Sequence, residues 1–98
     1  MLIKIHKAYR NLVSLVDKEL IGKEFEEGIK KIKINPNFFK GELKEEEAVI
    51  KILKEMENED AIFNIVGKKS IETALKAGII SKEGIIKIQN IPIALGLL

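Results

Sequence analysis

The sequence contains no cysteine and a single histidine, and these absences exclude several chemistries. Without cysteine there can be no disulfide scaffold, no thiolate metal site and no cysteine nucleophile. The one histidine, His6, cannot form a histidine cluster around a metal, so ligation would depend on carboxylates alone. The acidic run at 45–47 is explained as the first turn of a helix. We therefore expect no metal site and no cofactor.

Long apolar runs are also lacking. The longest, LVSLV at 12–16 and IPIALGLL at 91–98, are far too short to span a bilayer. The amino-terminal stretch MLIKIHK lacks the charged, apolar and small-residue regions of a signal peptide. We therefore expect a soluble, cytoplasmic protein with no membrane partner.

Charge of one sign is not in large excess, because 17 basic and 15 acidic residues give a formal net charge of +2. This excess is too small by itself to indicate a polyanionic partner. The abundance of lysine and glutamate, with few thermolabile side chains, fits a protein of a hyperthermophile, although an AT-rich genome would also favour lysine and the abundant isoleucine. With 98 residues, 46% hydrophobic and 33% charged, we expect one globular domain over residues 1–98.

The first half of the chain has the pattern of strands and turns. Residues 2–7 alternate apolar and polar side chains, and 11–16 form a second short apolar run. The segment between them, AYRN at 8–11, can close a hairpin, although it lacks the Asn-Gly pair typical of the tightest turns.

Turn residues dominate the next part of the chain. The segment 17–28 mixes polar residues with Gly22 and suits a turn or a single helical turn. Residues 29–34 alternate as a strand, which the following Asn-Pro-Asn stops because proline cannot donate to a ladder. We expect 37–43 to be extended, with Gly41 permitting a turn of the backbone.

The strongest helical pattern covers residues 43–60. Lysines and glutamates face water on one side of this predicted helix. The apolar side chains that fall on the other side are Ala48, Val49, Ile52, Leu53 and Met56.

Two shorter helices are predicted after it. Asp60 is expected to cap a helix over 61–66 that ends at Gly67. Ser70 is expected to cap a helix over 71–77, and Gly78 to end it in a left-handed conformation.

A closing strand over 84–91 completes the order of strands, helical pieces and strand. This order predicts an α+β fold: a small, mostly antiparallel sheet with an amphipathic helix and two shorter helices packed on it.

The segment NIVGKKSI at 64–71 suggests a phosphate-binding loop. A Walker-type loop requires the pattern G-x-x-x-x-G-K-[ST]. Ile62 occupies the position of the first glycine, and Lys69 that of the hydroxyl residue. The sequence therefore excludes this kind of nucleotide site.

Nucleic-acid binding at the same segment is compatible with the sequence. Two helices meeting at Gly67 resemble a helix-turn-helix or a helix-hairpin-helix in outline, although the latter needs a glycine where Lys69 stands. Lys68 and Lys69 can contact phosphates at a helix N-terminus. They can equally be solvated lysines of a lysine-rich protein.

A second basic run lies on the predicted strand over 29–34. Lys30, Lys31 and Lys33, with Phe38 and Phe39 nearby, could form a basic and aromatic face for single-stranded RNA. Alternatively, the lysines protect an edge strand from aggregation and the phenylalanines fill the core.

Catalytic motifs are not found. Ser14, Ser70 and Ser81 have no surrounding pattern that resembles a nucleophile elbow. His6, next to a lysine on a predicted strand, has the setting of a surface or half-buried side chain. We predict no catalytic residue, and an enzyme of unrecognised type stays an alternative.

Four segments taken in order resemble the archaeal family catalogued as domain of unknown function number 424. They are DKELIGKEFEEG, FFKGE, NIVGKKSIETALKAGII and IPIAL, and the resemblance extends from Ile3 to about Leu95. The chain departs from the family pattern at Phe39 and Lys40, where tyrosine and glycine are expected. The resemblance implies a small archaeal α+β protein with no established activity. The matching positions are Asp17, Gly22, Lys23, Gly28, Phe38, Gly41, Asn64, Gly67 and Pro92.

Our leading hypothesis is a non-catalytic binding module with an RNA or ribonucleoprotein partner. Lys23, Lys68 and Lys69 are the candidate contacts, together with Asn64. A buried Asn64 must find a hydrogen-bond partner, either a neighbouring backbone group or a ligand. The alternative is a protein-interaction or homo-oligomeric module, suggested by the apolar segment 91–98 as an exposed strand end.

Overall fold

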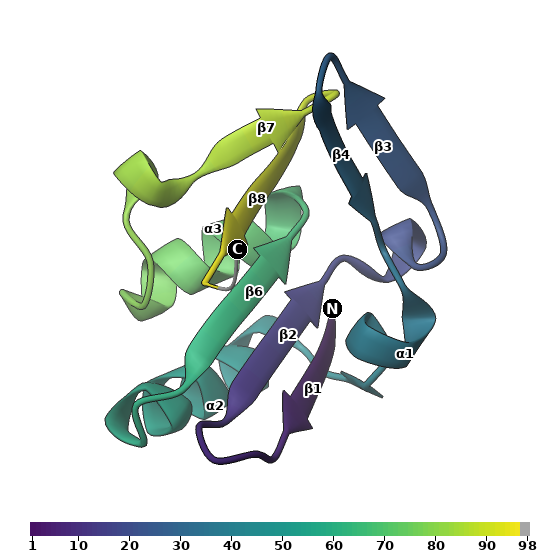
Figure 1. Cartoon of the computed structure of the whole chain (residues 1–98). Helices are drawn as coiled ribbons and strands as arrows, with labels where there is room; N and C mark the ends of the chain where they lie inside the picture. The colour runs from purple at the N-terminus through teal and green to yellow at the C-terminus, as the bar shows by residue number, and fades with distance from the viewer. Residues whose placement is uncertain (97–98) are drawn as a thin grey trace.

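The computed structural model describes residues 1–96 and contains a six-stranded sheet in the order β5-β1-β2-β6-β8-β7, with a separate two-stranded ribbon of β3 and β4 (Figure 1). In chain order the elements are β1 (Leu2–His6), β2 (Leu12–Val16), the 3-10 turn η1 (Lys18–Leu20), β3 (Glu24–Glu27), β4 (Lys30–Lys33), α1 (Pro36–Phe39), β5 (Glu42–Leu43), α2 (Glu46–Asn58), β6 (Ile62–Val66), α3 (Lys68–Ala77), the 3-10 turn η2 (Lys82–Gly84), β7 (Ile86–Ile88) and β8 (Ile91–Leu95).

The predicted fold class is confirmed. Every strand pairing is antiparallel except that of β2 with β6, which is parallel. The hairpin of β1 and β2 is present in the expected position, with Ile3 opposite Leu15 and Ile5 opposite Val13. The protein is therefore an α+β structure with a mostly antiparallel sheet.

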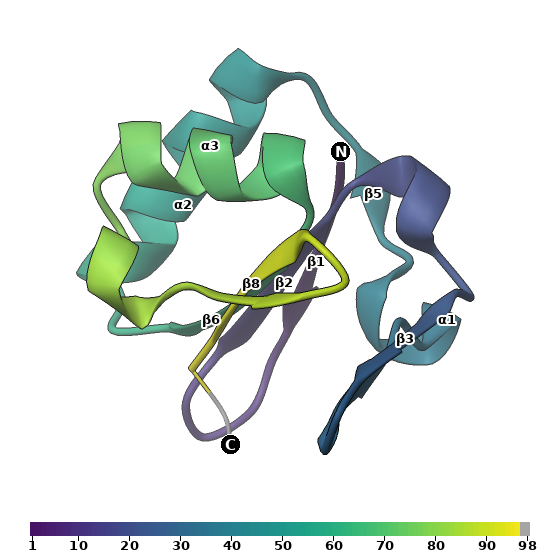
Figure 2. The same cartoon turned by 90° about the horizontal axis from the view of Figure 1, so that it is seen from above.

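The sheet separates two hydrophobic layers. Seen from above, α2 and α3 lie on one side of the sheet, and α1 with the ribbon lies on the other (Figure 2). Val13, Leu15 and Ile65 face the helices, and Val49 and Leu53 of α2 pack against them with no exposed surface. Alternation along each strand sends the next residues to the opposite layer.

The opposite layer is covered by short elements. Val16 and Val66 of the sheet pack there with Ile34 and Phe39, and all four are buried. Phe39 belongs to α1, so the prediction that 37–43 is wholly extended is wrong for its first half. Asn35 caps α1 by accepting the amide of Asn37 at 2.9 Å. Proline at the first helical position favours such a turn.

The predicted helix over 61–66 is wrong, because this segment is the central strand β6. A short segment of five apolar residues and one asparagine is compatible with helix or strand. The segment forms a strand because it pairs with β2 on one side and with β8 on the other. Asp60 is therefore no helix cap. It lies in a turn with a positive φ of 59°, and its carbonyl accepts a hydrogen bond from Arg10 Nε at 2.7 Å.

The amphipathic helix is present as α2, with one residue differing from the predicted stripe. Val49, Leu53 and Met56 are buried and Ile52 is half-buried, whereas Ala48 is exposed. The predicted end of the next helix is confirmed, since Gly78 follows α3 in the left-handed conformation with a φ of 74°. Gly22, with a φ of 81°, occupies a turn in which its amide donates to the Ile34 carbonyl at 2.8 Å.

Two segments hold more strand than expected. Residues 17–28 contain the expected helical turn as η1, and also strand β3. The single strand predicted over 84–91 is instead a hairpin of β7 and β8, because Gln89 and Asn90 both have positive φ, as in tight two-residue turns. β8 is consequently an internal strand between β6 and β7 rather than an exposed strand end. Residues 97–98 lie outside the described part of the chain.

Candidate functional site at the ends of the parallel strands

The parallel strands β2 and β6 end side by side, with Val16 opposite Val66. Asp17 directly follows β2, and its amide donates to the Val66 carbonyl at 3.2 Å. Gly67 directly follows β6 and leads into α3. The carboxyl ends of parallel strands in α/β sheets are common positions for binding sites. This place in the fold is therefore the first candidate.

The carboxylate of Asp17 is bound to the first turn of α3. Its Oδ1 accepts the Ser70 amide at 2.8 Å and the Ser70 hydroxyl at 2.7 Å, and its Oδ2 accepts the Lys69 amide at 3.1 Å. Asp17 is only 7% exposed. Free amides at a helix N-terminus can bind anions, but here the chain's own carboxylate already occupies two of them.

Gly67 and Ser70 have roles that differ from the predicted ones. Gly67 begins α3 instead of ending a helix, and its φ of 112° is unfavourable for other residues. A Cβ at position 67 would also overlap the Asp17 carboxylate. Ser70 lies inside the first turn of α3 instead of capping it. The capping group comes from Asp17, 53 residues earlier in the chain.

A small hollow of about 220 Å³ opens beside this capping contact. Lys18 and Lys69 contribute positive charge to it, and Glu19 and Glu45 contribute negative charge next to Asp17. The remaining lining residues are Met1 and Leu43. The mixture of charges gives the hollow no strong preference for a cation or an anion.

The three lysines predicted to contact a partner are all exposed, but they do not all line the same hollow. Lys69 lines the hollow, whereas Lys23 and Lys68 do not. Lys68 adjoins Lys69 in the first turn of α3, and Lys23 follows η1, where its amide donates to the Leu20 carbonyl at 3.1 Å. Within residues 1–96, none of the three forms an ion pair. Their charges are therefore available to a partner.

Asn64 is buried, whereas these lysines are exposed. It is 3% exposed on β6, and its Oδ1 accepts the Gly96 amide at 2.9 Å. This contact joins β6 to the end of β8, so Asn64 has a structural role of the kind considered from the sequence. The group bound is a strand backbone rather than a helix end.

The basic run on β4 is neutralised by its neighbour. Lys30, Lys31 and Lys33 stand opposite Glu27, Glu26 and Glu24 of β3. Lys31 forms an ion pair with Glu24 at 3.0 Å. A strand whose cations face a row of carboxylates presents little net positive charge to a polyanion, which favours the structural interpretation of this run.

The phenylalanines beside that run hold α1 in place. Phe39 is buried, and Phe38 stacks on His6 with 4.6 Å between the ring centroids. The Phe38 carbonyl lies 2.8 Å from His6 Nε2 and accepts the Ser14 hydroxyl at 2.9 Å. His6 and Ser14 thus support the packing of α1 on the sheet and do not converge with Asp17.

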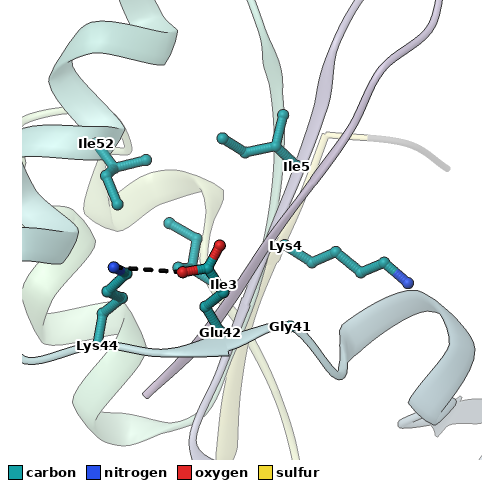
Figure 3. Close-up of a pocket in the computed structure, with 7 residues that line it drawn as sticks. All are labelled: Ile3, Lys4, Ile5, Gly41, Glu42, Lys44 and Ile52. Carbon is teal, nitrogen blue, oxygen red and sulfur yellow. Dashed lines mark ion pairs between the residues drawn. The ribbon is translucent and has the colours of Figure 1, made fainter.

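An apolar notch of about 280 Å³ lies at the open edge of β1. Ile3, Ile5 and Ile52 line it, and Lys4 points away to the other side of the strand (Figure 3). The ion pair of Glu42 with Lys44, at 3.3 Å, borders it. The notch offers apolar contact and one ion pair.

Neither a metal cluster nor a membrane-spanning helix is found in the described residues. No group of three or more histidine, cysteine or acidic side chains is placed to hold a metal ion among residues 1–96. Over the same part of the chain, no helix is long and apolar enough to cross a bilayer.

The turn between β1 and β2 was predicted from the sequence, but it was not considered as a candidate site. Tyr9 and Arg10 are the only tyrosine and the only arginine of the chain, and they are adjacent there. Tyr9 is completely exposed, and both residues line a hollow of about 350 Å³. The sequence did contain a signal for a candidate site here, because its one tyrosine and its one arginine are adjacent in a predicted turn.

The protein is a small α+β structure in which β6, Gly67 and α3 follow one another in the chain. The parallel strand β2 lies beside β6, and Asp17 at its end caps α3. The chain belongs to the family described as "Protein of unknown function (DUF424)", whose model matches residues 6–96. This confirms the resemblance seen in the sequence. No curated protein shows a significant match to the chain.

A similar structure supports the fold. It is described as an uncharacterized conserved protein from Methanopyrus kandleri, and it superimposes with a TM-score of 0.83. The match covers 95% of this chain and 86% of the other, at 21% sequence identity. At that identity, the likeness establishes a shared architecture alone.

Proposed function

We propose that the protein is a non-catalytic binding module whose partner is RNA, alone or within a ribonucleoprotein. The observation that carries this proposal is a set of exposed lysines near the carboxyl ends of β2 and β6 that form no ion pair within residues 1–96. Lys68 and Lys69 lie in the first turn of α3, and Lys23 follows η1. Lysine side chains at such a position suit phosphate contacts independent of base sequence.

The lysine side chains, rather than backbone amides, would make these contacts. Asp17 already accepts the amides of Lys69 and Ser70. A phosphate would therefore meet flexible ammonium groups at the rim, in a manner that depends strongly on salt. The proposal predicts modest affinity and little discrimination between sequences.

The experiment is a salt titration of RNA binding by fluorescence anisotropy. Replacing Lys68 and Lys69 by alanine should weaken binding and lower the slope of log K against log salt by about 0.7 for each lost phosphate contact on single-stranded RNA. The matched control replaces Lys51 and Lys54, two exposed lysines of α2, and removes the same charge.

The control separates a site from general charge attraction. If both double variants lose affinity equally, the lysines at α3 are not a specific contact. If the wild-type protein does not bind RNA at low salt, the proposed function is overturned. Folding of each variant is checked by circular dichroism before the comparison.

A second candidate function is protein interaction, and the open edge of β1 favours it. Within residues 1–96, β5 pairs with Leu2 and Ile3 only, so no described strand lies opposite Ile5 on that side, and Ile5 is 39% exposed. An extended segment could add to such an edge. Sedimentation of the wild type and of Ile5→Lys tests self-association, because a charged side chain at the edge blocks strand pairing. A monomer in both cases removes this candidate.

The proposed setting is the cytoplasm of a thermophilic archaeon. The abundance of lysine and glutamate and the family resemblance support it. A thermal unfolding midpoint near that of ordinary mesophilic domains, about 45–65 °C, would contradict the thermophilic part.

A further inference from the structure

Tyr9 has the highest relative exposure among the exposed large hydrophobic side chains of residues 1–96. Its relative exposure is 109%, and it makes no ring contact with another aromatic residue of the described chain. Aromatic side chains usually gain stability by being packed. A tyrosine held entirely in solvent contributes nothing to the core, so its ring is free to stack on a partner.

The turn that carries Tyr9 is anchored by the neighbouring residue. Arg10 donates through Nε to the Asp60 carbonyl at 2.7 Å and through a terminal nitrogen to Asp60 Oδ1 at 3.1 Å. The Ile62 amide donates to the Asn11 carbonyl at 2.9 Å, which ties the turn to the start of β6. These contacts hold the backbone around Tyr9, so less conformational entropy is lost when a ligand stacks there.

A hollow of about 350 Å³ lies at this turn, and Tyr9 is one of the residues that line it. Its walls include Asn11, Glu59 and Asp60, and Asp60 is paired with Arg10 while Glu59 forms no ion pair within residues 1–96. The Glu59 carboxylate can therefore accept hydrogen bonds, as carboxylates do from the amino group of cytosine. Lys7, exposed two residues before Tyr9, can contact a phosphate.

We infer that the β1–β2 turn is a nucleobase-binding site in which one unpaired base stacks on Tyr9, its amino group faces Glu59, and its phosphate faces Lys7. The inference rests on the proposed RNA-binding function and gives it a second contact. Stacking on an aromatic ring tolerates different bases. Glu59 adds a preference for adenine, cytosine or guanine over uracil, which has no exocyclic amino group.

The chain provides its own probe, because it contains one tyrosine and no tryptophan. Intrinsic fluorescence therefore reports on Tyr9 alone. Adenosine, cytidine and uridine 5′-monophosphates are titrated into the wild-type protein at low salt. Saturable quenching is expected, and it should require less adenosine or cytidine monophosphate than uridine monophosphate. Glu59→Ala should remove that difference.

Binding of labelled oligoadenylate of about ten nucleotides completes the test. Tyr9→Ala should weaken binding about tenfold, because stacking is lost. Tyr9→Phe keeps the ring and should bind within about threefold of the wild type. Ile29→Ala is the matched control, since Ile29 is equally exposed at 103% in another turn and should leave binding unchanged.

The outcomes distinguish this inference from the proposed function. In one outcome, replacing Lys68 and Lys69 weakens oligoadenylate binding, Tyr9 fluorescence does not change, and Tyr9→Ala binds like the wild type. This outcome overturns the inference and leaves the proposed function standing. Mononucleotide quenching without oligonucleotide binding overturns the function and leaves the base site. Quenching that depends on protein concentration without nucleotide shows that a second copy covers Tyr9, and it overturns the inference.

Discussion

Asp17 and Ser70 are joined by two hydrogen bonds, from the Ser70 amide at 2.8 Å and from the Ser70 hydroxyl at 2.7 Å, both to the same carboxylate oxygen. The two residues are 53 positions apart in the chain. Through this contact the end of β2 fixes the start of α3. A cap supplied from such a distance couples helix formation to assembly of the sheet.

Replacing Asp17 by alanine should lower the free energy of unfolding by about 2–3 kcal/mol, because the cap is lost and the Ser70 hydroxyl is left buried without a partner. Urea denaturation measures the change. Glu19→Ala is the control, since Glu19 lines the same hollow but is exposed, and it should alter stability by less than about 0.5 kcal/mol. Equal effects of the two substitutions would show that the cap contributes nothing.

Replacing Gly67 by alanine should destabilise the fold by at least about 2 kcal/mol, because the new Cβ meets the Asp17 carboxylate and the φ of 112° disfavours it. Gly84→Ala is the control, since a Cβ there has open space. The double variant with Asp17→Ala should lose less than the sum of the two single losses, because the clash disappears with the carboxylate. Strict additivity would contradict the contact.

Replacing Asn64 by alanine should lower the free energy of unfolding by about 1 kcal/mol, because the Gly96 amide loses its bond to Oδ1 but keeps its bond to the Phe63 carbonyl at 2.8 Å. Asn58→Ala, at the exposed end of α2, serves as the comparison. Chemical denaturation gives both values. RNA affinity of the folded variant should stay unchanged, so a clear loss of affinity would assign Asn64 to the binding surface instead.

The pKa of the Lys76 ammonium should lie above its ordinary value. A hydrogen bond of 2.7 Å to Glu46 raises the pKa of Lys76 above its ordinary value of 10.5, and Glu72 at 3.7 Å adds to this. Because the folded pKa lies above the unfolded one, the stabilisation is fully present below pH 10.5 and is lost as pH rises through the folded pKa. Carbon-13 titration of the lysine side chains should show a lower pKa for Lys76 in Glu46→Gln, and an unchanged pKa would refute the pairing.

Several residues that match the family pattern make contacts within the fold. The Gly67 amide donates to the Pro92 carbonyl at 3.0 Å, and Gly67 lies directly against Asp17. Gly41 lies against β1, where a Cβ would overlap the Ile3 carbonyl. Asn64 holds the end of β8. These positions join separate strands, so the recurring pattern serves the fold before it serves any ligand.

Secondary structure was predictable from the sequence where a helix is long or where a short turn joins two neighbouring strands. The helix α2 has a complete apolar stripe along its buried face apart from Ala48, and the β1–β2 hairpin joins neighbours in the chain. The segment 61–66 was not predictable, because five apolar residues carry no period that separates strand from helix. The Asp17 cap was equally hidden, since Ser70 offered a local alternative with the right side chain.

The sequence by itself determined the α+β class, the amphipathic helix, the hairpin of β1 and β2, the absence of thiol and histidine-cluster chemistry, and the family. The tertiary structure alone decided that 62–66 is the central strand, that Asp17 caps α3, and that the lysines of β4 face glutamates. The physical reason is the range of the interactions. Period, propensity and composition act within a few residues, whereas strand pairing and a distant cap depend on segments that meet only when the chain has folded.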